Sequence, residues 1–150
     1  MNDEKILNAL APCGLNCEKC YAHVDGEIRQ YSRKLKNKLG NFAAYAEQFA
    51  TLLDDPIFKK YPDFQAMLDY LAGENCKGCR KENCKLFKNC GVRSCHQGKD
   101  VDFCFQCNEF PCDKTNFDVN LQKRWVAINE RIRQIGIEKY YAETRDKPRY

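Results

Sequence analysis

Eleven cysteines in a chain of 150 residues constrain the fold of this protein more than any other feature of its sequence. They fall within two stretches, residues 13–20 and 76–112, and the other segments contain none. The first residues are polar and charged, so we expect no secretory signal and assign the chain to the reducing cytoplasm, where thiols stay unpaired. An odd number of cysteines also cannot pair completely within one chain. The pattern therefore predicts metal ligation rather than a framework of disulfides.

Pairs of cysteines separated by two residues are typical of metal-binding loops, because both sulfurs can reach one ion while the backbone amides of the loop face them. Cys76 and Cys79 form one such pair, and Cys104 and Cys107 form another. The predicted ligands in this part of the chain are Cys76, Cys79, Cys84, Cys90, Cys95, Cys104, Cys107 and Cys112. Because loops can interleave, the division of these ligands between ions stays open.

A further group of ligands is predicted near the N-terminus, where Cys13, Cys17 and Cys20 follow one another at short spacings. His23 lies three residues beyond Cys20 and is the predicted fourth ligand, with a distant cysteine as the alternative. Gly14 fits a tight ligand loop, since glycine takes positive φ at low cost. The spacing is also similar to the cluster motif of radical S-adenosylmethionine enzymes, but their large barrel of alternating strands and helices is not indicated here. We expect a closed structural site, with an open metalloenzyme site as the alternative.

The number of candidate ligands is compatible with two kinds of metal centre. Eleven cysteines and one histidine make twelve donors, enough for three tetrahedral zinc sites. The cysteines alone divide into fours with three left over, which suits two closed 4Fe–4S clusters and an open one. The cysteine run of bacterial ferredoxins is absent, and zinc tolerates varied spacings. We predict two to three Zn2+ sites, with 4Fe–4S clusters as the alternative cofactor. His96, beside Cys95, is the less favoured histidine ligand.

Hydrophobic spacing predicts helices where cysteines are absent. Apolar residues recur every three to four positions, Gly40 and Pro56 mark helix ends, and Gly136 separates the last two helices. Long alternation with period two is missing, so no sheet is expected. We predict a single mainly α domain over residues 1–150, with irregular metal-stabilised loops. Its segments are helical at 24–73 and 117–145, Cys-rich at 13–23 and 76–112, and frayed at 145–150.

Charge and aromatic residues narrow the expected function. Ligation by all eleven thiols as thiolates lowers the formal net charge from +4 to −7, and three zinc ions return it to about −1. Basic residues between 76 and 99 are therefore expected to offset thiolate charge, and neither nucleic acid nor a membrane is an expected partner. Tyr31, Tyr45, Phe49 and Trp125 are expected in the core. No recognised catalytic motif occurs, so the predicted role is a binding or regulatory module with an unidentified protein partner.

Several motifs taken together resemble an uncharacterised cysteine-rich family of bacteria and archaea. They occur in the family's order over residues 11–140, as Ala11–Cys20, Cys76–Arg80, Cys90–Cys95, Cys104–Cys112 and Arg133–Ile137. The family is a domain of unknown function suspected of binding zinc. The resemblance implies metal binding and a small cytoplasmic protein, and it implies no activity. The alternative function is an iron–sulfur redox protein, or a metalloenzyme with an open metal site at Cys13, Cys17 and Cys20.

Overall fold

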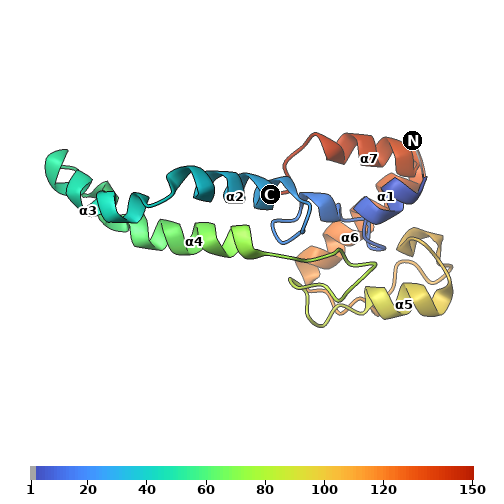
Figure 1. Cartoon of the computed structure of the whole chain (residues 1–150). Coiled ribbons are helices and arrows are strands. Elements are labelled where there is room, and N and C mark those ends of the chain that lie inside the picture. Colours follow the sequence, from blue (N-terminus) through green and yellow to red (C-terminus); the bar gives the residue numbers. More distant parts are fainter. Residues whose placement is uncertain (1–2) are drawn as a thin grey trace.

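The computed structural model describes residues 3–150 and contains seven α-helices. No strand forms within these residues, and only two isolated bridges occur, Leu10 with Asn16 and His23 with Cys76. The predicted mainly α fold is therefore confirmed. Figure 1 shows an arm made of α2, α3 and α4 that projects from a body containing α1, α5, α6 and α7.

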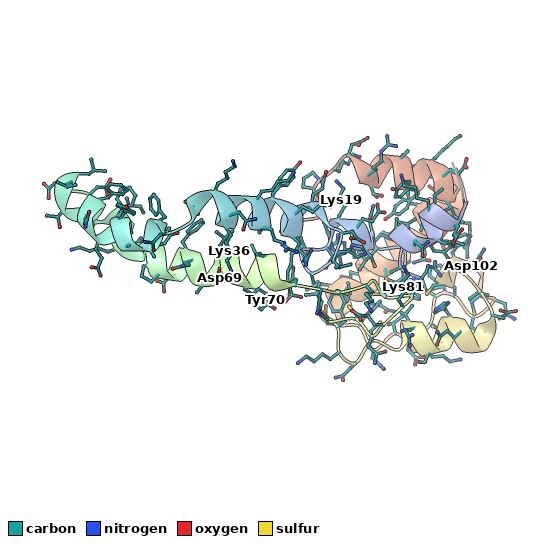
Figure 2. All side chains as sticks on the ribbon, viewed as in Figure 1. Lys19, Lys36, Asp69, Tyr70, Lys81 and Asp102 are labelled. Carbon is teal, nitrogen blue, oxygen red and sulfur yellow. The ribbon has the colours of Figure 1, made fainter. Side chains whose placement is uncertain are left out.

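The arm is built from the helices that hydrophobic spacing predicts. Helix α2 (Glu27–Leu39) and helix α4 (Tyr61–Gly73) pack side by side in opposite directions, and α3 (Phe42–Leu52) lies at the far end (Figure 1). Gly40 ends α2 with a positive φ of 52°. Lys36 of α2 forms an ion pair with Asp69 of α4 across 2.9 Å, and both are labelled in Figure 2.

Two of the four aromatic residues expected in the core are exposed to solvent instead. Tyr31 is 62% exposed and Tyr45 is 52% exposed, whereas Phe49 is half-buried. The prediction is wrong for these two tyrosines because a pair of helices with no third layer buries only one narrow face of each helix. Trp125, which belongs to the body, is 2% exposed, as predicted.

The body is organised around α6 (Val119–Ile135), whose first turn is capped by the Asp118 carboxylate. Gly136 separates it from α7 (Ile137–Arg145), as predicted. Helix α1 (Asp3–Ala9), which the sequence analysis did not predict, joins α6 and α7 around one apolar cluster. Its buried members are Ile6, Ala9, Leu10, Phe103, Ile132, Tyr140 and Tyr141.

The C-terminal tail returns to the N-terminal cysteine loop, although we expected residues 145–150 to be frayed. Arg149 Nη1 donates to the backbone carbonyl of Asn16 across 2.8 Å. The Tyr21 backbone N–H donates to the Tyr150 hydroxyl, which in turn lies 3.8 Å from Cys20 Sγ. The tail is ordered because its polar groups satisfy backbone groups of a partly buried loop.

The second Cys-rich stretch contains a short helix that periodicity does not reveal. Helix α5 (Val92–Lys99) lies inside the segment 76–112 that we expected to be irregular. Only Val92 of this helix is buried, so its sequence carries no apolar stripe. Short 3₁₀ helices at Cys17–Lys19 and Cys104–Gln106 turn the chain at two of the cysteine motifs.

Candidate metal centre

The eleven cysteines line two cavities in the body. A cavity of about 170 Å³ is bordered by His23 and seven cysteines, which are Cys13, Cys17, Cys20, Cys76, Cys79, Cys84 and Cys90. A smaller cavity of about 20 Å³ is bordered by His96 and the other four cysteines, which are Cys95, Cys104, Cys107 and Cys112. Tertiary structure thus divides the cysteines into two groups, a division that spacing along the chain had left open.

Cys79 lines the larger cavity and contacts sulfurs from different parts of the chain. Its thiol is in hydrogen-bonding contact with the sulfurs of Cys17 and Cys84, and its backbone N–H donates to Cys17. These hydrogen bonds lower the pKa of Cys17 to about 7 and that of Cys84 to about 6, while the pKa of Cys79 is raised. Since the thiolate is the form that binds metal, Cys17 and Cys84 can supply thiolate ligands near neutral pH.

Backbone amides face the sulfurs in the loop that carries Cys76 and Cys79. The Gly78 N–H donates to Cys76 Sγ across 3.4 Å, and the Phe87 N–H donates to Cys84 Sγ across 3.4 Å. Gly78 takes a φ of +96°, which an L-residue with a side chain rarely adopts. This is the loop geometry that a pair of cysteines separated by two residues needs in order to present both sulfurs to one ion.

His23 is held against the second Cys-rich stretch by backbone hydrogen bonds. The Val24 N–H donates to the Cys76 carbonyl and the Cys76 N–H donates to the Ala22 carbonyl, each across 2.8 Å. His23 Nδ1 accepts a hydrogen bond from the Asp25 N–H at 3.3 Å, so the neutral ring carries its proton on Nε2. Burial lowers the pKa of this histidine, which keeps the ring neutral. Binding of a metal through Nε2 would require the other tautomer.

The three N-terminal cysteines face different surroundings within the larger cavity. Cys13 is buried, and burial raises the pKa of its thiol to about 12. Cys17 contacts Cys79, whereas Cys20 lies beside the C-terminal tail, with its Sγ 3.8 Å from the Tyr150 hydroxyl. The loop between them bends as expected, with a φ of +87° at Gly14. The three N-terminal cysteines thus line the same cavity as the cysteines of residues 76–90.

His96 is a candidate ligand that the sequence analysis placed last. Its Nδ1 lies 2.9 Å from the Val101 carbonyl oxygen, which can only accept, so the proton of the neutral ring belongs on Nδ1. Its Nε2 is buried without a partner among residues 3–150. The sequence signal for this arrangement is slight, because adjacency to Cys95 says nothing about where the ring nitrogens point.

The donor chemistry of both cavities suits a soft or borderline metal. Thiolates and imidazoles bind zinc and iron–sulfur clusters, whereas Mg2+ and Ca2+ prefer oxygen ligands. Within the described part of the chain, no three histidine, cysteine, aspartate or glutamate side chains are already arranged to hold a metal ion. In the larger cavity, thiols instead hydrogen-bond with one another. Rotation of these cysteine side chains would allow the same sulfurs to bind a metal ion.

Fold and site together define a cysteine-rich, mainly α-helical protein whose cysteines surround two cavities. The chain belongs to the family described as "Protein of unknown function (DUF3795)", which matches residues 9–117. The match contains every cysteine and confirms the resemblance, although Arg133–Ile137 lies beyond its end. No curated protein and no solved structure matches the chain. None of the helices within residues 3–150 is long and apolar enough to cross a membrane.

Proposed function

We propose that this protein binds Zn2+ through its cysteines and that the metal holds together a module for binding another protein. The observation that carries the proposal is that Cys79, from the second Cys-rich stretch, contacts both Cys17 from the first stretch and Cys84 from the second. A metal ion bound by these sulfurs would cross-link two segments that are distant in sequence. Such a cross-link stabilises a fold because the unfolded chain has no preformed site.

A structural role for the metal agrees with the composition of the second apolar cluster. Its buried members include Cys13, Cys17, Val92 and Trp125, and several further cysteines pack against it. Thiols thus occupy positions that larger apolar side chains fill in ordinary cores. Without metal, the loops of residues 76–90 would depend on few apolar contacts and on hydrogen bonds between thiols.

The test is elemental analysis of protein purified without oxygen, together with the variant Cys79→Ser. We expect at least two zinc ions per chain in the unchanged protein and a lower content in the variant. Tyr31→Ser serves as the control, because this side chain lies on the arm and is exposed. Less than one metal ion per chain in the unchanged protein would overturn the proposal.

An iron–sulfur centre is the second candidate, and the size of the larger cavity favours it. About 170 Å³ bordered by seven cysteines offers more room than one tetrahedral ion needs. A 4Fe–4S cluster there would give a brown protein with broad absorption near ~400 nm and would make a redox role the leading proposal. Colourless protein containing stoichiometric zinc would exclude this candidate.

A further inference from the structure

The smaller cavity brings together four cysteines from three segments of the body. Cys95 comes from α5, Cys104 begins a 3₁₀ helix that Cys107 follows, and Cys112 lies in the loop before α6. The space of about 20 Å³ holds little more than one water-sized sphere, which matches a single ion rather than a cluster. Val92 is buried and lines both cavities, so its side chain stands between the two groups of cysteines.

Trp125 supplies an independent sign that a charged sulfur belongs in this cavity. The indole is 2% exposed, and its Nε1 has no hydrogen-bond partner in the described chain. Edge-to-face contacts fix the ring, with centroids 4.8 Å from Phe110 and 6.4 Å from Phe117. Cys104 lines the same cavity as Trp125, packs against the apolar cluster that contains the indole, and is the thiol with which this N–H interacts. A buried N–H that lacks a full acceptor is satisfied better by a thiolate than by a thiol.

The charges around the cavity suit a centre with four thiolates. Zn2+ bound by four thiolates carries a net charge of about −2. Lys99 and Lys114 line the cavity, and both form ion pairs with Glu109. These three side chains leave one positive charge beside the thiolates. Cys95 and Cys112 line the same cavity as Cys104.

From this arrangement we propose a second, separate centre for one tetrahedral metal ion, to whose Cys104 sulfur the Trp125 indole N–H donates a hydrogen bond. Its four ligands are Cys95, Cys104, Cys107 and Cys112. The inference rests on the proposed function, since it requires that the chain binds metal. It goes further by separating this ion from the metal of the larger cavity and by assigning Trp125 as a positioning residue. His96 Nε2 remains a fifth donor beside a filled coordination shell.

The first test uses the single tryptophan of the chain as a reporter. Metal-free protein is titrated with Co2+, a paramagnetic ion that quenches nearby indole fluorescence. We expect quenching to saturate as one equivalent fills the smaller cavity. Cys112→Ser should abolish the quenching and lower the bound Co2+ by one equivalent. Cys79→Ser, the matched control from the larger cavity, should lower the stoichiometry and keep the quenching.

The second test measures how firmly the ion is held. Trp125→Phe removes the indole N–H and keeps an aromatic ring. We expect unchanged stoichiometry and about 10-fold faster transfer of one zinc ion to a chelator, with the other zinc ions unaffected. A merely structural role for Trp125 would change the release of all the ions or of none. His96→Ala should retain every ion.

The outcomes distinguish the proposed function from the proposed second centre. Protein that binds no metal would overturn both. Metal-loaded protein that retains all its ions in Cys112→Ser and Cys107→Ser would overturn only the second centre. Loss of one ion in His96→Ala but not in Cys95→Ser would overturn the all-cysteine ligand set. Where a variant fails to fold, alkylation of the unchanged zinc-loaded protein during chelation tests the second centre. Its four cysteines should become reactive together, and at a different time from Cys17, Cys79 and Cys84.

Discussion

The side-chain amide of Asn129 donates a hydrogen bond to the backbone carbonyl of Cys13 across 2.9 Å. Asn129 is fully buried in α6, and its Nδ2 also donates to the Trp125 carbonyl at 3.0 Å. Its Oδ1 accepts from the Phe105 N–H at 3.0 Å. One side chain therefore ties the N-terminal cysteine loop and the loop carrying Cys104 to the same helix, and so aligns the walls of both cavities.

Replacement of Asn129 by Ala should therefore destabilise the protein strongly. The change leaves the Phe105 N–H and the Cys13 carbonyl buried without this partner, so we expect the free energy of unfolding to fall by about 2–4 kcal/mol. Urea denaturation measures it, with Gln97→Ala on exposed α5 as the control. A loss below about 0.5 kcal/mol would contradict the role given to Asn129.

Gly91→Ala should separate two walls of the cysteine region. A Cβ at Gly91 would lie 2.1 Å from the backbone carbonyl oxygen of Lys114, and the Gly91 N–H donates to the Thr115 carbonyl at 3.0 Å. Because the obstructing atom belongs to the backbone, we expect a loss of about 2 kcal/mol in unfolding free energy and weaker metal retention.

The matched control for that change is Gly98→Ala in the same region. Apart from its chain neighbours and the backbone of its own helix, no described atom lies within 4 Å of a Cβ at Gly98, which is a helical position in α5. Alanine there should leave stability unchanged or raise it by up to ~1 kcal/mol. Thermal unfolding of the two variants side by side checks the pair, and equal losses would show that the approach to Lys114 is not the cause.

The metal-free protein should lose stability as the pH rises above 9. Burial raises the pKa of Cys13 to about 12 and that of Cys76 and Cys104 to about 11, from an ordinary value of 9.0. Unfolding exposes these thiols, which then release protons that the folded state retains. Their contribution to stability is complete below pH 9 and is lost as the pH rises toward the folded pKa values.

Denaturation under reducing conditions between pH 8 and pH 10.5 measures this effect. The metal-loaded protein is the control, because its ligands are already thiolates and the loss should be much smaller. If the metal-free protein instead became more stable over this range, the buried thiols would not be protonated in the folded state.

Phe42→Ala should loosen the end of the arm without affecting the body. The Phe42 ring lies 4.9 Å from the Tyr61 ring, 5.6 Å from Phe49 and 6.3 Å from Phe58, between centroids. Phe42 is only half-buried, so we expect a local loss of about 2 kcal/mol, below the range for a fully buried phenylalanine. Hydrogen exchange should rise in α3 but not in α6, and metal content should stay constant. Faster exchange in α6 would mean that arm and body unfold together.

Much of the helical layout could be predicted from the sequence, because helix ends depend on nearby residues. Gly40, Pro56 and Gly136 interrupt the helices where the sequence analysis expected, through backbone conformations that these residues favour or forbid within one turn. The short helix α5 escaped prediction because a helix that buries one residue leaves no periodic signal. Cysteine content and spacing likewise determined the family and the class of candidate ligands.

Tertiary structure alone decided which residues meet. Nothing in the sequence indicates that Cys79 contacts both Cys17 and Cys84, that Arg149 returns to the N-terminal loop, or that Tyr31 is exposed to solvent. These outcomes depend on packing between segments far apart in the chain, where the free energy of burial and of satisfying buried polar groups outweighs local preference. The set of candidate ligands therefore follows from residue type and spacing in the sequence, whereas the division of the cysteines between two cavities depends on the packed fold.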